Sequence, residues 1–237
     1  EMIYAAFRLR VYAGRIDQAA QLAPAVLATR PGDGFANLVL AVEAIKKGDY
    51  RAAERQLGRI GPENQLGALR EFVLAWLKAG EKDYAAARAH LARLKPAAGE
   101  RSEAPTLVIE AQIDELAGDK AAAEAKYRRA ASLDRTGLRT TLAVAEGLRR
   151  LGKDADAREL LKTYGEKYSD AVVVDALIAP NAPMPKPPSP AAGIAEILFD
   201  IGGILASDQR NQLADLALIF YQLAASLKPD QDFAWLM

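Results

Sequence analysis

The residue types that most often carry enzyme chemistry are scarce in this sequence. The chain has a single histidine, His90, and no cysteine, which excludes thiolate metal sites, cysteine nucleophiles and disulfides. His90 lies in the stretch AAARAHLARL without a second histidine nearby, whereas a zinc site needs several nitrogen or sulfur ligands. We therefore interpret His90 as a partly exposed packing residue of a helix and not as a metal ligand.

Phosphate-binding, hydrolase and calcium-binding motifs are also missing. The sequence contains no Gly-x-x-x-x-Gly-Lys-Ser/Thr loop, no Gly-x-Ser-x-Gly elbow and no acidic calcium loop. The glycine pair in DIGGIL falls inside an expected helix, where Gly202 and Gly203 would permit close helix contact. The sequence therefore predicts no catalytic residue, no metal site and no cofactor, and it indicates a protein that is not an enzyme.

The amino-acid composition of the chain argues against nucleic acid and membranes as binding partners and favours a helical fold. Thirty-one basic and thirty-one acidic residues give no net charge, whereas binding to nucleic acid or to a membrane surface generally needs a basic excess. No apolar run approaches the roughly 18 residues that a membrane-spanning helix requires. Apolar residues make up 51% of the chain and aromatic residues only 7%, with abundant alanine, which favours closely packed helices. We expect an all-α protein that neither binds nucleic acid nor inserts into a membrane.

The helices that would position any binding residues follow a repeating pattern. The phrase GDYRAAERQL has counterparts in AGRIDQAAQL, KDYAAARAHL, AGDKAAAEAKY and LGKDADARELL. Aligned on the alanine that follows each turn, the five phrases recur with a period of about 34 residues, and only the third interval is slightly longer. A glycine at each turn suits a left-handed helix end, and the alanine allows the two helices of a unit to pack closely. The aligned alanines are Ala19, Ala53, Ala87, Ala123 and Ala157, and the turn glycines are Gly14, Gly48, Gly80, Gly118 and Gly152.

This pattern resembles the tetratricopeptide-repeat family over nearly the whole chain. The resemblance implies an α-solenoid, in which antiparallel helix hairpins stack into an open right-handed superhelix. Residues 1–169 would form five hairpins. Residues 191–237 would form a sixth hairpin, matched by Ala217, Tyr221 and Ala224, and then the first helix of a truncated next repeat at Trp235. Both ends of the sequence look cut.

An insert interrupts the period between the fifth and sixth hairpins. The interval from Ala157 to Ala217 exceeds the repeat period by about 26 residues. Residues 170–190 would hold a short apolar helix over 170–178 and then a segment with six prolines, which cannot be helical and should run extended. This segment is either a stiff crossover along the solenoid or a ligand for an aromatic groove.

The last hairpin, with its sequence ALIFYQLAASLKPD, is similar to a passage in large bacterial repeat proteins of alphaproteobacterial type. Such proteins are often predicted to be exported, and some bacterial relatives act as envelope adaptors that present substrates to a protease. The resemblance therefore implies a periplasmic or cell-envelope location over a cytoplasmic one.

Charge is distributed unevenly along the repeats. Residues 100–124 hold seven acids and two bases, whereas residues 126–153 hold eight bases and two acids. Three interpretations follow: neighbouring repeats neutralise each other, the basic stretch binds an acidic partner, or it binds RNA. The last is disfavoured because base stacking needs several aromatic residues and this stretch holds only Tyr127.

In the tetratricopeptide-repeat family, the first helix of each hairpin lines a concave groove. The family thus implies a non-catalytic scaffold or adaptor that binds a partner segment in this groove. The alternatives are a segment that serves homo-oligomerisation, and a regulatory repeat region of a larger protein whose catalytic domain lies elsewhere. A core role between repeats stays open for Phe35, Leu38 and Val42. The groove residues that the family implies are Tyr4, Arg8, Val11, Phe35, Leu38, Val42, Ile45, Arg70, Leu74, Gln112, Glu115, Arg139, Glu146 and Arg149, with Leu77, Val108 and Leu142 at neighbouring positions.

Overall fold

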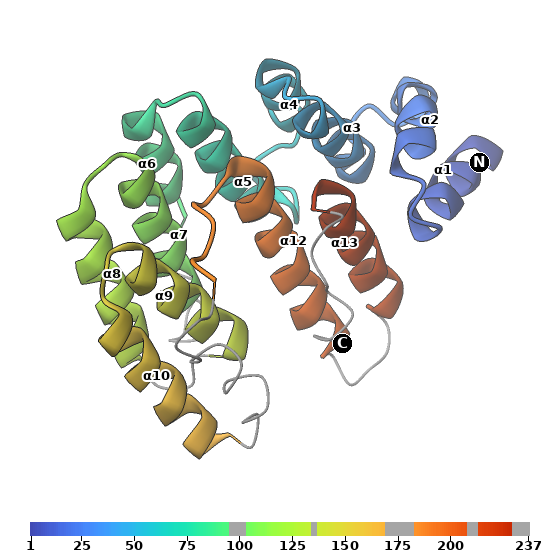
Figure 1. The fold of residues 1–237 in the computed structure, drawn as a ribbon. Coiled ribbons are helices and arrows are strands. Elements are labelled where there is room, and N and C mark those ends of the chain that lie inside the picture. Colours follow the sequence, from blue (N-terminus) through green and yellow to red (C-terminus); the bar gives the residue numbers. More distant parts are fainter. Residues whose placement is uncertain (95–102, 134–136, 169–182, 208–212, 229–237) are drawn as a thin grey trace. The chain divides into compact units, whose positions relative to one another are not determined.

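The computed structural model describes residues 1–94, 103–133, 137–168, 183–207 and 213–228, and every regular element within them is an α-helix (Figure 1). Neighbouring helices contact each other in pairs, which confirms the predicted all-α fold of repeated helical hairpins. The helices are α1 (Met2–Tyr12), α2 (Ile16–Thr29), α3 (Gly34–Lys46), α4 (Tyr50–Leu57), α5 (Gly67–Gly80), α6 (Tyr84–Ala92), α7 (Glu103–Leu116), α8 (Lys120–Ser132), α9 (Leu138–Arg150), α10 (Asp154–Lys167), α12 (Pro190–Ala206) and α13 (Ala214–Leu227).

In the first five predicted hairpins, the turn between the first and second helix uses one left-handed residue. Four of the predicted glycines adopt it, with φ between 69° at Gly14 and 82° at Gly118. The third turn differs, because Lys82 takes the left-handed conformation at φ 64° and Gly80 is the last residue of α5. A Cβ at Gly80 would lie 2.7 Å from the rings of Tyr50 and Pro190, so this glycine is required for close packing. The prediction of Gly80 as the turn residue was wrong by two positions.

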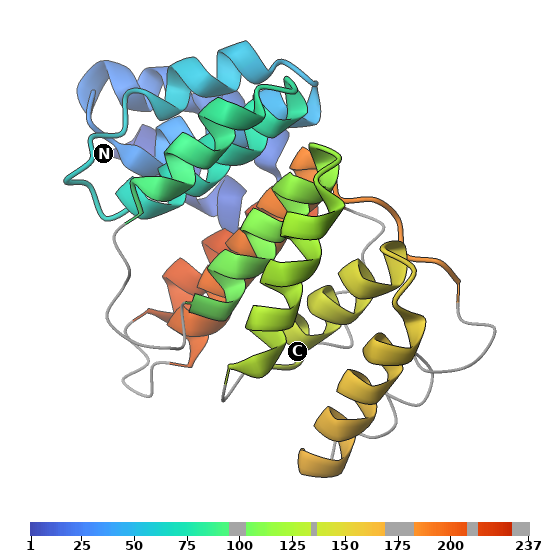
Figure 2. The ribbon, with the colours of Figure 1, turned by 90° about the vertical axis from the view of Figure 1, so that its left-hand side faces the viewer.

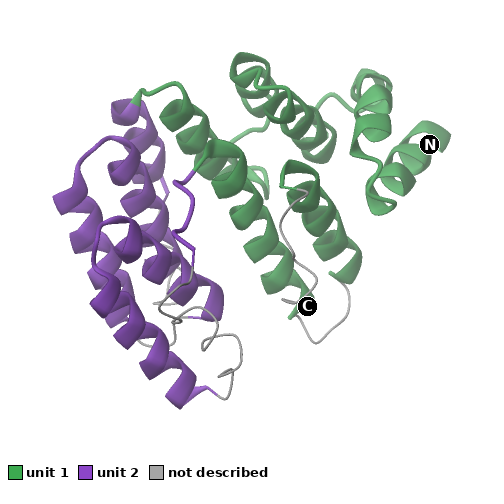
Figure 3. Cartoon of the chain, viewed as in Figure 1, with its two compact units in different colours: residues 1–83, 189–237 green, residues 84–188 purple. Residues whose placement is uncertain are grey.

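The chain divides into two compact units (Figure 3). Unit 1 comprises residues 1–83 and 189–237, and unit 2 comprises residues 84–188. The first boundary falls between Asp83 and Tyr84, in the turn of the third predicted hairpin.

Unit 1 combines the N-terminal hairpins with the last hairpin of the chain. Helix α2 contacts α1 and α3, and α4 contacts α3 and α5. Helices α12 and α13 form a hairpin of their own, in which α12 packs on α5 while α13 packs on α1, α2 and α3 (Figure 1). The last two described helices therefore pack on helices of the first three predicted repeats.

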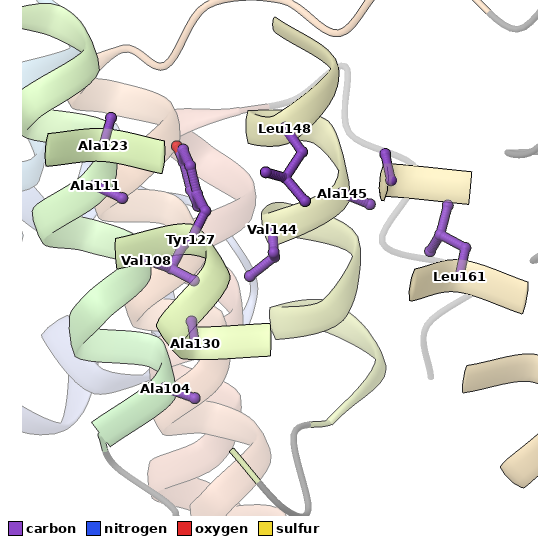
Figure 4. Packing of buried hydrophobic residues seen from close by; sticks show 11 residues of the cluster. Ala104, Val108, Ala111, Ala123, Tyr127, Ala130, Val144, Ala145, Leu148 and Leu161 are labelled. Carbon is purple, nitrogen blue, oxygen red and sulfur yellow. The ribbon is translucent and has the colours of Figure 1, made fainter. Parts of the chain in front are cut away.

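Unit 2 holds the hairpins α7–α8 and α9–α10, with α6 packed on α7 and α8 packed on α9 (Figure 2). Its core is built from small and branched side chains around one aromatic residue, Tyr127, which is fully buried (Figure 4). The alanines predicted to permit close packing, Ala123 and Ala157, are both completely buried here. Close alanine contacts therefore hold the hairpins together, as the repeat pattern predicts.

The proline-rich segment is described only in part. Residues 183–189 contain no helix, as their prolines predict, and α12 begins at Pro190, where a missing N–H has no consequence. The Ser189 side chain accepts a hydrogen bond from the Ala192 N–H at 3.3 Å and caps this helix. The short helix predicted over 170–178 and the helix predicted around Trp235 lie outside the described residues.

Candidate interaction groove of unit 1

Helix α13 packs on α1 and α3, the two helices that hold the predicted groove positions of the first two repeats. Leu38 and Val42, for which both core and groove roles were open, are buried at 1% and 0% exposure. Phe35 remains partly exposed and packs edge-to-face on Phe220 of α13, with ring centroids 6.1 Å apart. Val11, Ile45 and Leu74 are buried as well, whereas Tyr4, Arg8 and Arg70 are partly buried.

Helix α13 is held by polar as well as apolar contacts. The Gln222 side-chain amide donates a hydrogen bond to the Tyr12 carbonyl at 3.2 Å. Tyr12 is the last residue of α1, and carbonyls at a helix end have no partner within the helix. A Cβ at Gly14 would lie 2.7 Å from the Gln222 side-chain oxygen, so the turn after α1 is shaped to receive this side chain. Leu223 and Ala224 are fully buried beside it.

Helix α12 packs on α5 around Trp76. The Trp76 side chain is fully buried, and a Cβ placed on Gly193 of α12 would lie 2.1 Å from its ring. With the third repeat aligned on Lys82, Trp76 lies one repeat period after Val42 and occupies the equivalent groove position. The sequence prediction missed Trp76 because it took Gly80 as the turn residue that ends the first helix of this repeat, although the spacing from Ala53 to Ala87 already places Trp76 one period after Val42.

The same error of two residues explains why Arg70 and Leu74 were predicted as groove residues of the third repeat. Each lies two residues before the position that is one repeat period after Leu38 or Val42. Arg70 instead serves the local structure before α5. Its guanidinium donates to the Ile60 carbonyl at 2.6 Å and to the Glu71 carboxylate at 3.0 Å. In this register, Phe72 and Trp76 take the positions that Leu38 and Val42 hold in the second repeat.

A pocket of about 310 Å³ remains open beside α13. Four of its wall residues are groove residues that the family resemblance implied, and they come from α1 and α3. The remaining walls come from the same helices and from the start of α13. The lining residues are Tyr4, Phe7, Arg8, Val11, Phe35, Val39, Leu213, Asp215, Leu216 and Ile219.

Two charged residues, Arg8 and Asp215, line this otherwise apolar pocket. Arg8 donates a hydrogen bond to the Tyr12 hydroxyl, and this bond is the main cause that raises the pKa of Arg8, with the charge of Asp215 adding to it. Arg8 therefore stays cationic. The Tyr4 ring stacks on Phe7 at 6.3 Å and carries the Arg30 guanidinium 4.1 Å from its centroid, which fixes the aromatic wall in place.

In unit 2, by contrast, residues of the first helices α7 and α9 bond directly to each other. Glu115 accepts hydrogen bonds from Arg150 at 2.7 and 3.1 Å and from the Tyr127 hydroxyl at 3.0 Å. Arg150 also donates to the Lys186 carbonyl of the proline-rich segment at 3.4 Å. Burial, followed by the neighbouring Glu115 charge, raises the pKa of Tyr127. Glu115, predicted as a partner-binding residue, thus belongs to a largely buried network of α7, α8 and α9.

The other groove residues predicted in unit 2 are more accessible. Gln112, Arg139 and Arg149 are partly buried, and Arg149 pairs with Asp154 at 3.4 Å. Glu146 is exposed and lies 3.9 Å from Arg150. Arg149 and Glu146 therefore already take part in ion pairs within their own unit.

The uneven charges of unit 2 pair with each other. Asp114 on α7 is only 1% exposed. Its carboxylate forms ion pairs with Arg88 of α6, at 2.8 Å, and with Lys126 of α8. Arg128 bridges to Asp156 at 2.5 Å, so the contact also joins α8 to α10. These contacts favour the interpretation that neighbouring repeats neutralise each other. In the basic stretch 126–153, the residues that form ion pairs are Lys126, Arg128, Arg129, Arg149, Arg150 and Lys153. Arg135 lies outside the described residues.

His90 is partly buried on α6, and its Nδ1 lies 3.2 Å from the Arg93 guanidinium. Within the described ranges, no group of three or more histidine and carboxylate side chains could hold a metal ion. Nor does any helix in these ranges have the length and apolar character needed to cross a membrane.

No protein-family model matches the chain, and no curated protein matches it.

Proposed function

We propose that this chain is a non-catalytic interaction scaffold of tetratricopeptide-repeat type, which binds a helical or extended segment of a protein partner in the pocket between α1, α3 and α13. The observation that carries the proposal is the pocket itself. Tyr4, Arg8, Val11 and Phe35 are distributed over two repeats of the sequence and meet in its wall.

The remainder of the groove supports the same function. It holds an amphipathic helix of the chain's own, α13, through apolar contacts such as Phe35–Phe220 and one hydrogen bond to a helix end. Helix-in-groove binding uses this chemistry, with apolar anchors at helical spacing. The surface is therefore suited to helices, and a partner segment would extend along the part that α13 leaves open.

The pocket also indicates what the partner should present. A volume of about 310 Å³ is at the lower end of the roughly 300–1,000 Å³ typical of ligand pockets, which suits one or two bulky side chains. Aromatic rings and aliphatic groups line most of the wall, so the anchors should be aromatic or aliphatic. Arg8 and Asp215 would orient the polar groups that flank these anchors.

The proposal is tested by selecting peptides from a displayed library of amphipathic helices against the intact protein. We expect selected peptides to share aromatic or aliphatic anchors three or four residues apart. Tyr4→Ala and Phe35→Ala should each weaken binding of these peptides about 30-fold, because truncation of a central aromatic anchor costs about 2 kcal/mol. Isothermal titration calorimetry measures the affinities.

The matched control is Tyr168→Ala, which removes a partly exposed aromatic residue that follows α10 and does not line the pocket. This variant should bind the peptides as well as the unmodified chain does. Circular dichroism must show unchanged helicity in all three variants. Equal affinity for the unmodified chain and for both pocket variants would contradict the proposed function.

A further inference from the structure

The described part of the proline-rich segment has one covered side. Residues 183–188, called the strap from here on, contain no helix, belong to unit 2 and precede α12 in the chain (Figure 1). Pro185 and Pro188 are partly buried, whereas the other residues of the strap are exposed. A polyproline helix has three residues per turn, so positions three apart fall on the same side. The burial pattern of the strap is therefore that of a polyproline helix with one covered face.

A hydrogen bond to its backbone holds the strap on α9. The Lys186 carbonyl, between the two covered prolines, accepts this bond from Arg150 Nη1 at 3.4 Å. A polyproline helix has no internal hydrogen bonds, so its carbonyls are free to accept from a binding surface. The strap thus presents to α9 the features by which binding surfaces recognise proline-rich peptides, a preformed extended backbone with prolines on one side.

The Arg150 guanidinium is held in position by its other bonds. Its Nε and Nη2 donate to Glu115 at 2.7 and 3.1 Å, and Nη2 also donates to the Tyr127 hydroxyl at 3.3 Å. Nη1 faces the strap and lies 3.9 Å from Glu146. Because the Arg150 side chain is only 8% exposed, a segment that covers it must supply a hydrogen-bond acceptor to Nη1. A proline-rich backbone meets this need, since it offers carbonyls and few N–H groups.

We propose that the surface of unit 2 around Arg150 is a binding site for an extended proline-rich peptide, and that the strap occupies this site as an intramolecular ligand. Two roles for this segment were open from the sequence, a crossover or a ligand for an aromatic groove. The bond to Arg150 makes the strap a ligand of its own chain, and a largely buried guanidinium receives it in place of an aromatic groove.

This site is separate from the proposed partner pocket, whose lining residues all belong to unit 1. A proline-rich segment of a partner protein binds around Arg150 only when the strap leaves. The strap therefore regulates access to unit 2 by competing for the site, and a tethered ligand competes at a high effective concentration.

The test compares two double substitutions in the strap of the full chain. Pro185→Ser with Pro188→Ser removes the covered prolines and is called the covered-face variant. Met184→Ser with Pro187→Ser changes exposed positions only and is the matched control. Both variants keep the cap of α12. The probe is a fluorescein-labelled peptide of residues 183–190, and fluorescence anisotropy measures its affinity for each chain.

We expect the covered-face variant to bind the peptide about 10-fold more tightly than the unmodified chain or the control variant does. A strap at an effective concentration of about 1 mM weakens a peptide with a Kd of about 0.1 mM by roughly this factor. A peptide with serine at both covered positions should not bind, because it lacks the preformed polyproline backbone. Circular dichroism must show equal helicity, and Pro185→Ser alone replaces the double substitution if helicity falls.

Equal affinity of the peptide for the three chains would overturn the inference, and so would equal binding of the proline and serine peptides. A third measurement adds Phe35→Ala to the covered-face variant. Binding should be unchanged, because Phe35 lines only the pocket of unit 1. Loss of binding would show that the peptide occupies that pocket and would overturn the assignment of the site to Arg150.

Discussion

Replacement of Trp76 by alanine should lower the free energy of unfolding by about 3–5 kcal/mol, the usual loss for a fully buried large aromatic side chain. The ring is completely buried on α5 and touches Gly193 of α12. Its removal would leave a cavity at the contact that joins the last hairpin to the first repeats. Urea denaturation followed by circular dichroism measures the loss.

A change on the opposite side of this contact should have a related effect. Gly193→Ala introduces a Cβ 2.1 Å from the Trp76 ring and should cost about 1–3 kcal/mol, as overpacking usually does. Gly203→Ala is the matched control on the same helix, because its Cβ would meet only the Tyr221 hydroxyl at 3.8 Å. Alanine favours helix over glycine by up to about 1 kcal/mol, so the control should be neutral or stabilising.

The double variant separates direct contact from independent effects. In a chain with Trp76→Leu, the smaller side chain leaves room for the new methyl group, and Gly193→Ala should cost less than it does beside tryptophan. Additive losses in this double-mutant cycle would show that Trp76 and Gly193 do not touch.

The second large effect concerns the buried network of unit 2. Arg150→Met should destabilise the protein by about 3–5 kcal/mol, because it leaves the Glu115 carboxylate without its cation in a largely buried site. The Arg150 and Glu115 side chains are only 8% and 13% exposed. The Tyr127 hydroxyl would keep its bond to Glu115, but one neutral donor cannot replace the two charged donor groups.

Arg128→Met is the control for this experiment. Arg128 also forms two ion pairs, with Glu124 and Asp156, but its side chain is 49% exposed. Exposed ion pairs contribute about 0–1 kcal/mol, so this loss should be small. Equal destabilisation by the two substitutions would contradict the assignment of Arg150 to a buried network.

Local features of the fold could be predicted from the sequence because each depends on a few neighbouring residues. The turn glycines, the alanines at helix contacts and the regular repeat spacing all act within one hairpin, and the structure confirms the turns at Gly14, Gly48, Gly118 and Gly152. The third turn escaped prediction because Lys82 adopts a conformation that glycine usually takes. Counting one repeat period onward from Gly48 would have found it.

The return of the last hairpin could not be predicted in this way. The hydrogen bond from Gln222 to Tyr12 joins residues 210 positions apart, and no local pattern specifies such a pairing. An amphipathic helix shows which of its faces is buried, but several surfaces of a repeat array could cover that face. Family positions therefore predicted Tyr4 and Phe35, which line the pocket, whereas the walls from Leu213 and Ile219 came only from the structure.

The central claim is that α13 lies in the groove of the first repeats of its own chain, and a pair of cysteines tests it most directly. The chain has no cysteine of its own, so Tyr12→Cys and Gln222→Cys can be labelled without background. The Gln222 amide nitrogen lies 3.2 Å from the Tyr12 carbonyl, so a short bismaleimide should link the two positions rapidly within one chain. Single-cysteine variants control for links between chains. Mass spectrometry should find the link in monomers; its absence there, or its presence only in dimers, would contradict the claim.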